Sequence, residues 1–335
     1  MIRMSDIIKM NAVNESGSEK KVLLKETQKQ DIPIVEKESE IQKLEGMKLY
    51  NRGINLIEDV LNKARVEDDC RPGLVVDFAK ILVENVLTEE DEQSLRFYEI
   101  GSPQDYLPSH SFNVSFMSTK IGMWYGLNKS QLTELFMASF LHDVGMIKVE
   151  SIVRKEHSLS TQERMRVQRH PEYSEQMIRK MDCLGEDGLN AVKTHHCRGQ
   201  RDIFSQIISL ADIYEAITHP RVYKPARSAH QAIGEVIEKE TENFEQNILK
   251  AFVNNIGIYP VGSWVALNTG ETGMVIGANK GYPLRPKVNI IFDREGEQLK
   301  EKKILDFLTE PYFYIEGPFD IAGQECLKTA QQAGN

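Results

Sequence analysis

The chain of 335 residues lacks the features that mark several large classes of protein. No run approaches the roughly 18 consecutive apolar residues that a membrane-spanning helix needs. The first residues, MIRMSDIIKM, lack the apolar stretch and small-residue cleavage site of a signal peptide. The four cysteines are scattered and form no CxxC pair, which is typical of reduced thiols. These absences predict a cytoplasmic protein without membrane association.

The chain also lacks a long basic block. Its formal net charge is −9, with 41 lysines and arginines against 50 aspartates and glutamates. Binding of long nucleic acid depends on many Lys and Arg contacts to phosphate, so nucleic acid is not an expected partner. A small anionic substrate is compatible with the negative charge, because a local positive cluster or a bound metal ion reverses the local field.

The pattern of apolar residues divides the chain into four parts and predicts a mainly α fold. Residues 1–44, rich in Lys, Glu, Gln, Asn and Ser, are expected to form a mobile or weakly ordered N-terminal segment. Residues 45–253 carry apolar residues at spacings of three and four, which predicts several helices around one core. Residues 254–318 contain β-branched and alternating runs between turn signals, which predicts a small antiparallel β module. Residues 319–335 are expected to form a tail. The strands predicted in the module are 261–267, 273–277 and 288–292.

Histidines and aspartates occupy unusual places in the helical part. His110 continues an apolar stripe that runs through 114–124, so its imidazole is expected on the inward face of a helix. His142 and Asp143 follow the helix predicted for 132–141. The helix dipole leaves negative charge at that end, so the carboxylate is disfavoured there unless a cation lies nearby.

Further histidines and an aspartate extend this pattern. His170 stands at an expected helix start, before a proline. His195 and His196 end a helical stripe, so their imidazoles point in directions about 100° apart. Asp212 lies inside an apolar helical segment, where an isolated ionised carboxylate would be very costly. It is therefore paired, bound to metal, or on an exposed polar stripe with Glu215.

Each of these signals has an ordinary structural explanation when it is taken alone. Together, five histidines and two aspartates within about a hundred residues exceed what one tetrahedral zinc ion needs. They suit two octahedral first-row ions bridged by a shared carboxylate, and iron or manganese fits better than zinc. The predicted metal ligands are His110, His142, Asp143, His170, His195, His196 and Asp212.

At these residues the sequence resembles the HD-GYP family of bacterial cyclic-di-GMP phosphodiesterases, a branch of the HD phosphohydrolase superfamily. The segment after Tyr259 resembles the β tail that many such proteins carry. The matching pieces are HSFNV at 110–114, LHDVG at 141–145, HPEYSEQMI at 170–178, HH at 195–196 and LADIYEAITHPRVYKPARS at 210–228.

The resemblance implies an HD-type helical bundle and a role for each matching residue. Arg221 and Lys224 match positions that contact substrate phosphate, and a solvated basic turn is the alternative. Cyclic-di-GMP would be hydrolysed to linear pGpG and/or GMP by a water that two metal ions activate. Signalling proteins are further candidate partners. In the implied metal site, His110, His142 and Asp212 bind one ion, His170, His195 and His196 bind the other, and Asp143 bridges the two.

The sequence departs from the family in three places. Only 15 residues separate His196 from Asp212, and the loop with the Gly-Tyr-Pro motif is absent. Met146 stands where the family has a lysine, and Tyr106 where members with a third metal have a glutamate. We therefore expect two metals and an open cleft. Two alternatives remain: a catalytically weak or inactive signalling and binding module, and an HD phosphohydrolase acting on another nucleotide phosphoester.

Overall fold

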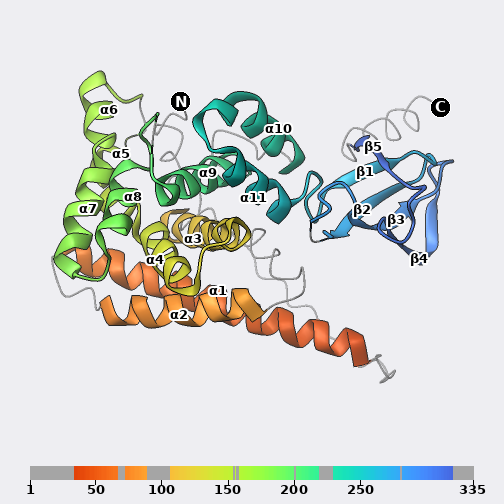
Figure 1. The fold of residues 1–335 in the computed structure, drawn as a ribbon, viewed down its shortest axis with the longest axis horizontal. Coiled ribbons are helices and arrows are strands. Elements are labelled where there is room, and N and C mark those ends of the chain that lie inside the picture. The colour runs from red at the N-terminus through yellow and green to blue at the C-terminus, as the bar shows by residue number, and fades with distance from the viewer. Residues whose placement is uncertain are drawn as a thin grey trace, which may run out of the picture.

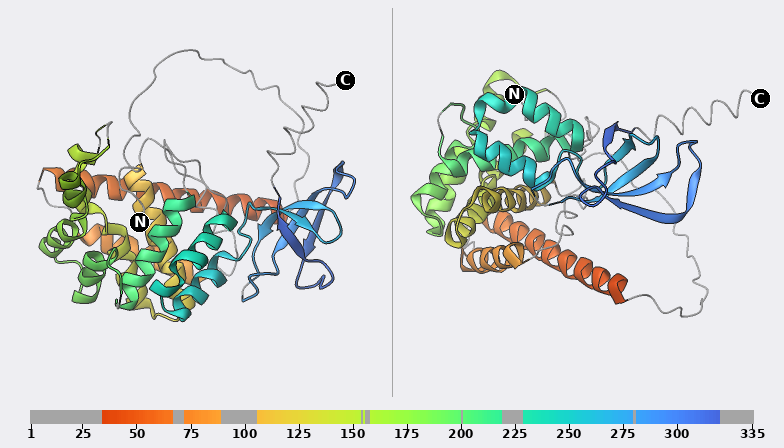
Figure 2. Two further views of the ribbon diagram at one scale, coloured as in Figure 1. Left: turned by 90° about the horizontal axis from the view of Figure 1, so that it is seen from above. Right: turned by 45° about the vertical axis from the view of Figure 1, so that its right-hand side comes forward.

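The structure is a computed structural model that describes residues 34–66, 72–88, 106–153, 155, 158–199, 201–218, 229–279 and 281–319. A bundle of helices is followed by a small antiparallel sheet (Figure 1), so the predicted fold class is confirmed. The sheet lies at one end of the bundle in both views of Figure 2. Within the described ranges, no helix is both long and apolar enough to cross a membrane.

The helical part is made of helices of very different lengths, and two of its elements are short 3-10 helices. In chain order they are α1 (Ile34–Arg65), α2 (Pro72–Thr88), α3 (Tyr106–Tyr125), α4 (Lys129–Leu141), η3 (Val144–Lys148), α5 (Glu150–Val153), α6 (Thr161–Val167), α7 (His170–Met181), α8 (Glu186–Thr194), α9 (Ile203–Thr218), α10 (Ala229–Glu240), η4 (Thr241–Asn243) and α11 (Gln246–Ile256).

Helix α1 begins earlier than the sequence pattern suggests. Residues 34–44, expected to be weakly ordered, are helical, and α1 runs without interruption to Arg65. Their composition is consistent with this, because Glu, Lys and Gln have high intrinsic helix propensity. The rest of the predicted N-terminal segment, residues 1–33, lies outside the described residues.

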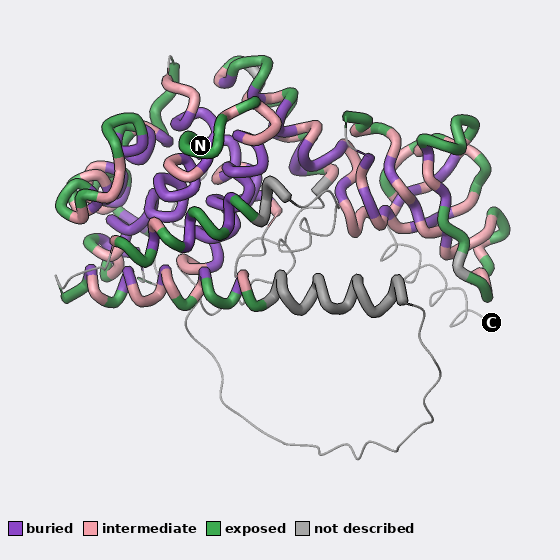
Figure 3. The backbone as a smooth tube through the Cα atoms, turned by 60° about the horizontal axis from the view of Figure 1, so that its bottom comes forward, coloured by how far each residue is buried: buried purple, intermediate pink, exposed green. Residues whose placement is uncertain are grey.

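Helix α3 forms the centre of the bundle. Every residue from Ser109 to Gly122 is buried, and α1, α4, α9 and α11 pack against this helix (Figures 1 and 3). The ring of Phe78 on α2 lies 6.4 Å from that of Phe112 on α3 and 5.9 Å from that of Phe136 on α4. These contacts pack α2 against α3 and α4, and α9 packs against α3 as well.

Capping boxes define the starts of two helices, α4 and α6. At the start of α4, the Asn128 side chain accepts from the Gln131 backbone N–H, and the Gln131 side chain accepts from the Asn128 backbone N–H. Ser160 and Glu163 do the same at the start of α6. Reciprocal caps satisfy the backbone donors that a helix start leaves unpaired. As a result α4 has a defined start, and it ends at Leu141, immediately before His142.

The β module is a five-stranded sheet in which all neighbouring strands are antiparallel. Its order is β4-β3-β2-β1-β5, and its apolar residues form a cluster separate from the helical core. Three strands overlap the predicted ones, while β4 and β5, at the two edges, were not predicted. The strands are β1 (Trp264–Leu267), β2 (Thr272–Gly277), β3 (Lys287–Phe292), β4 (Gln298–Asp306) and β5 (Ile315–Pro318).

Candidate metal centre

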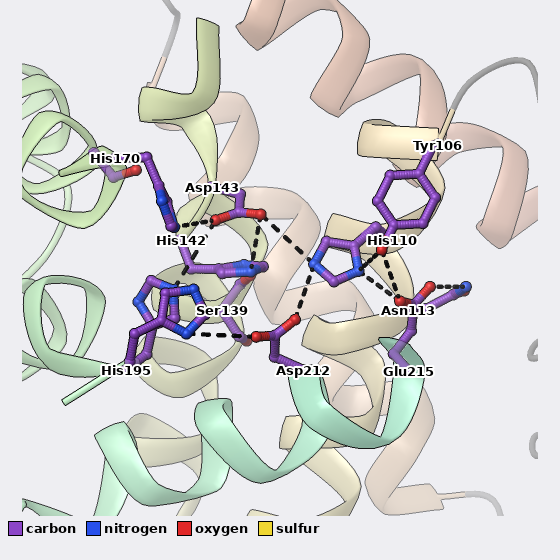
Figure 4. A network of polar contacts seen from close by, with 12 residues as sticks. Tyr106, His110, Asn113, Ser139, His142, Asp143, His170, His195, Asp212 and Glu215 are labelled. Carbon is purple, nitrogen blue, oxygen red and sulfur yellow. Dashed lines mark hydrogen bonds and ion pairs between the residues drawn. The ribbon is translucent and has the colours of Figure 1, made fainter. Parts of the chain in front are cut away.

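The seven side chains predicted to bind metal come from separate elements and meet in one place (Figure 4). Two clusters stand out, and in each one a ligand atom of every residue lies within 4.8 Å of the others. One cluster holds His110, His142 and Asp143, and the other His170, His195 and His196. The seven residues are His110 near the start of α3, His142 after α4, Asp143 before η3, His170 at the start of α7, His195 and His196 after α8, and Asp212 in α9.

Three of the histidines are oriented by the same local device. The Nδ1 atoms of His142, His170 and His195 lie 2.7, 2.9 and 2.6 Å from the carbonyl oxygen three residues earlier. A carbonyl oxygen only accepts, so each imidazole donates its Nδ1 proton and keeps a lone pair on Nε2. For His170 the accepting carbonyl is that of Val167, which receives no bond from Pro171 because proline lacks an N–H.

The inward-facing atoms of these residues have no hydrogen-bond partner within the part of the chain that the structure describes. Nε2 of His142, His170 and His195 and Oδ1 of Asp143 are all buried and unsatisfied. Buried polar atoms in folded proteins are nearly always paired, so four such atoms together require an explanation. Burial lowers the pKa of His142 and His195, which favours the neutral imidazole that binds metals. This donor set fits bound divalent cations.

Asp143 lies between the two clusters, with one carboxylate oxygen facing each. Oδ1 is 3.0 Å from Nε2 of His170 and 4.0 Å from Nε2 of His195. Oδ2 is 3.6 Å from Nε2 of both His110 and His142. Burial alone would raise the pKa of Asp143, but the surrounding imidazoles, His142 and His170 foremost, hold it well below its usual range. The arrangement suits an ionised carboxylate shared by two cations.

Asp212 and His196 form the outer rim of the centre. Oδ1 of Asp212 is 3.3 Å from Nε2 of His110, and Oδ2 is 3.8 Å from Nδ1 of His196. The His196 side chain is 47% exposed, whereas that of Asp212 is 14% exposed and that of His195 is fully buried. Of the seven predicted ligand residues, His196 is the most exposed, and it marks a side from which a substrate could approach.

Gly145 allows the two halves of the centre to approach each other. Gly145 lies within η3, after the end of α4, and η3 packs against α7. A Cβ at this position would lie 2.4 Å from both the His170 carbonyl oxygen and the Ser174 backbone nitrogen. The Gly145 N–H donates to Oγ of Ser174 over 2.8 Å. The glycine is needed for the close contact that brings Asp143 and His170 together.

Sequence reasoning missed the role of Glu215. An exposed polar stripe was considered for this residue, but its side chain is only 1% exposed, because α9 packs here against α3. Oε2 of Glu215 lies 2.6 Å from Nδ1 of His110, and the Tyr106 hydroxyl is 3.4 Å from the same oxygen. Burial alone would lower the pKa of His110, but Glu215, with help from Asp212 and Asp143, raises it to about 9. The signal was the i, i+3 spacing from Asp212, which puts both carboxylates on one helix face.

The departures from the family pattern can be placed only in part. Helix α9 begins seven residues after His196, at Ile203, so the connection between α8 and α9 is short. Met146, which stands where the family has a lysine, is buried. Lys148, two residues further along the chain, lies exposed on η3. Arg221 and Lys224, the predicted phosphate contacts, lie outside the described residues.

Comparison with protein families supports this organisation. Residues 104–248 match the HD domain, and residues 264–325 match the KOW domain associated with HD domain. The first match contains all seven predicted ligands, and the second covers the sheet of the β module.

Several curated phosphodiesterases are similar to this chain. A cyclic di-GMP phosphodiesterase of Pseudomonas aeruginosa is 26% identical over 258 residues, which cover 71% of this chain and 62% of the relative. Cyclic di-GMP phosphodiesterase PdeB of Borreliella burgdorferi is 25% identical, over 59% of this chain and 53% of the relative. A 3'3'-cGAMP-specific phosphodiesterase of Vibrio cholerae is 26% identical, over 54% and 36%. The chain thus spans between about a third and two thirds of the length of these relatives.

A solved structure shares the fold. Bd1817, an HDG"Y"P protein of Bdellovibrio bacteriovorus, superposes with a TM-score of 0.50 at 14% identity, over 61% of this chain and 69% of that one.

Proposed function

Because the chain is a divergent member of the HD-GYP family, we propose that it is a metal-dependent phosphodiesterase that hydrolyses cyclic-di-GMP to linear pGpG and/or GMP. The observation that carries this proposal is the set of buried, unpartnered ligand atoms around Asp143. A structural role for the histidines would leave these atoms with hydrogen-bond partners. Similarity to cyclic dinucleotide phosphodiesterases supports the substrate class.

The proposed metals are two divalent first-row ions, iron or manganese. When bound, such ions activate a water and neutralise charge on the scissile phosphate. His110, His142 and Asp212 would hold one ion, and His170, His195 and His196 the other. The oxygens of Asp143 point to opposite clusters, which supports a bridging role for this residue.

The protein's own contribution is mainly orientation. The backbone carbonyls that accept from Nδ1 fix three imidazoles with Nε2 inward, so little reorganisation is needed when substrate binds. The half-exposed His196 would leave the rim open to a phosphodiester. Arg221 and Lys224 follow α9 in the chain, and we assign them the task of neutralising the substrate phosphates, as the family resemblance implies.

A second candidate is favoured by the short connection between α8 and α9 and by the exposed His196. An HD-GYP-like site without its covering loop would make fewer contacts to the bases and sugars of a dinucleotide. Such a chain would act as a weakly active or inactive signalling and binding module, or as a phosphohydrolase of another nucleotide phosphoester.

The test is turnover by protein stripped of metal and reloaded with Fe(II) or Mn(II) under reducing conditions. We expect cyclic-di-GMP to be hydrolysed by the reloaded protein, but not by the stripped protein or by a reloaded Asp143→Asn variant. Binding of cyclic-di-GMP without product would favour the signalling module. Faster hydrolysis of another nucleotide phosphoester would favour the other phosphohydrolase. Loss of folding in Asp143→Asn is checked by circular dichroism.

A further inference from the structure

His110 is held differently from the other buried histidines of the centre. His142, His170 and His195 each donate from Nδ1 to a neutral backbone carbonyl. Nδ1 of His110 instead lies 2.6 Å from the carboxylate of Glu215, a residue 105 positions later in the chain. The backbone carbonyls near His110 belong to a continuing helix, α3, so the polar partners of Nδ1 are side chains: the Glu215 carboxylate and, at 3.2 Å, the Tyr106 hydroxyl.

Helix α9 supplies carboxylates to both nitrogens of this one imidazole. Oδ1 of Asp212 is 3.3 Å from Nε2 of His110, while Oε2 of Glu215 is 2.6 Å from Nδ1. The two acidic residues are three positions apart and therefore share a helix face. A metal ion on Nε2 would leave the Nδ1 proton in place, donated to Glu215 (Figure 4).

Burial of the Glu215 carboxylate costs solvation free energy, which its contact with His110 offsets. Its side chain is 1% exposed, and Oε1 lies 3.5 Å from Nδ2 of Asn113, a long contact. A carboxylate removed from water is destabilising unless hydrogen bonds and a positive partner compensate it. A cation on the far nitrogen of His110 would draw charge through the imidazole and strengthen the bond to Glu215.

The two metal positions are therefore unequal in charge. The ion held by His110 and His142 would have Asp143, Asp212 and, behind His110, Glu215 near it. Of the carboxylates in the described ranges, the ion held by His170, His195 and His196 would have Asp143 close to two of its imidazoles, with Asp212 reaching the exposed His196. A divalent cation is attracted more strongly where more negative charge lies close.

We propose that Glu215 is a positioning residue that acts through His110 and makes the His110 position bind its metal ion first and more tightly than the other position. The proposal rests on the binuclear centre of the proposed function. It assigns the two ions different exchange behaviour: the ion at the His170 position leaves first, and the ion at the His110 position remains. Carboxylate partners of metal-bound histidines have effects of about 10- to 100-fold on metal affinity.

The experiment is a stepwise chelator titration of the full chain loaded with Mn(II), followed by elemental analysis at each step. For the wild type we expect two separate losses of about one ion each. In Glu215→Gln, which keeps the size of the side chain but not its charge, the tighter ion should weaken by about 10- to 100-fold and the weaker ion should be little changed. In the His110→Ala background, which should keep only the ion at the His170 position, adding Glu215→Gln should leave the affinity for that ion unchanged, whereas a merely structural role would weaken it.

Two matched variants control for the chemical change. Glu134→Gln alters another partly buried carboxylate, which accepts from the Gly188 N–H over 3.2 Å and lies outside the centre. It should leave both affinities unchanged. Tyr106→Phe removes a hydroxyl 3.2 Å from Nδ1 of His110 but keeps the ring, whose centroid lies 5.2 Å from that of the imidazole. It should cost less affinity than Glu215→Gln. Circular dichroism checks that all variants remain folded.

The possible results separate this inference from the proposed function. Two ions of equal affinity in the wild type, or unchanged affinities in a folded Glu215→Gln, would overturn the inference and leave the binuclear centre in place. An equal loss of both ions in Glu215→Gln would overturn it too. A wild-type protein that holds no metal would overturn both.

Discussion

Oδ1 of Asp143 lies 3.0 Å from Nε2 of His170, and among the described residues neither atom has a hydrogen-bond partner. When the His170 ring carries a single proton, that proton is on Nδ1 and is donated to the Val167 carbonyl, so Nε2 offers Asp143 only a lone pair. Two buried acceptors at this distance repel each other unless a proton or a metal ion lies beside them. A cation bound beside both atoms would remove this repulsion.

Removal of the carboxylate proposed to bridge the ions, Asp143, should cost more metal than removal of a residue proposed to bind one ion. Asp143→Ala should retain almost no metal, because Asp143 faces both clusters and screens the repulsion between two cations. His110→Ala should retain about one ion per chain, since His110 belongs to one cluster. Elemental analysis of both folded variants after dialysis measures the difference. Equal retention in the two would argue against the bridge.

The close contact at Gly145 predicts a steric effect on the centre from a residue that is not itself a predicted ligand. A Cβ there would lie 2.4 Å from two backbone atoms of α7, so Gly145→Ala should destabilise the fold by about 1–3 kcal/mol and reduce metal content. Gly234→Ala on α10 is the matched control. Its Cβ would meet no atom within 4 Å, and alanine should stabilise this helix by about 0.5–1 kcal/mol. Chemical denaturation measures both changes. A neutral Gly145→Ala would show that η3 can move away from α7.

The raised pKa of His110 predicts how the stability of metal-free protein changes with pH. Folding raises the pKa of His110 from an ordinary value of 6.5 to about 9. A group of this kind makes its full contribution to the stability of the folded state below pH 6.5, and this contribution is lost as the pH rises through 9. The lowered pKa values of His142 and His195 act at lower pH, where protonation of the unfolded chain destabilises the fold. Between pH 7 and 9, the charge of His110 should therefore dominate the difference in stability between the wild type and the His110→Gln variant.

Thermal unfolding in the presence of a chelator measures this difference. The gap in Tm between the wild type and His110→Gln should shrink steadily from pH 7 to pH 9. A gap that stays constant or widens over this range would show that His110 is not charged in the metal-free protein.

The short connection between α8 and α9 predicts an unusual substrate preference. With His196 half exposed, cyclic-di-GMP should be held by few contacts and turned over slowly, because positioning supplies much of the rate. A small diester such as bis(p-nitrophenyl) phosphate should be accepted comparatively well. Steady-state kinetics on both substrates test this. Fast and selective turnover of cyclic-di-GMP would mean that another segment frames the substrate.

One substitution can distinguish the role of the proposed phosphate contacts from that of the proposed metal ligands. Arg221→Ala should lower activity on cyclic-di-GMP and leave metal content unchanged, since its proposed partner is phosphate. Kinetics and elemental analysis on the same preparation check both parts. A loss of metal in the folded variant would contradict the assigned role.

Several parts of the site could be predicted from sequence because their chemistry is hard to explain otherwise. A carboxylate at a helix C-terminus, as at Asp143, opposes the helix dipole, and Asp212 interrupts an apolar segment. Glu215 has the same character but lies in a helix that could equally expose it, so only the packing of α9 against α3 reveals its partner.

The missed strands have a comparable explanation. β4 reads QLKEKKILD and β5 ends in a proline, and both lie at edges of the sheet. Edge strands tolerate charge and proline because one side of the strand has no neighbour in the sheet, so they lack the alternating apolar pattern by which β2 and β3 are found. A similar lack of apolar spacing hid the first turns of α1, where helix propensity rather than core packing is the signal.

The most direct test of the binuclear centre is anomalous diffraction from crystals of the metal-loaded protein, collected at the iron or manganese absorption edge. The account predicts two peaks about 3.5–4 Å apart, one on each side of the Asp143 carboxylate, with His142 beside one and His170 beside the other. A single peak, or no peak among these residues in protein prepared with excess metal, would contradict it.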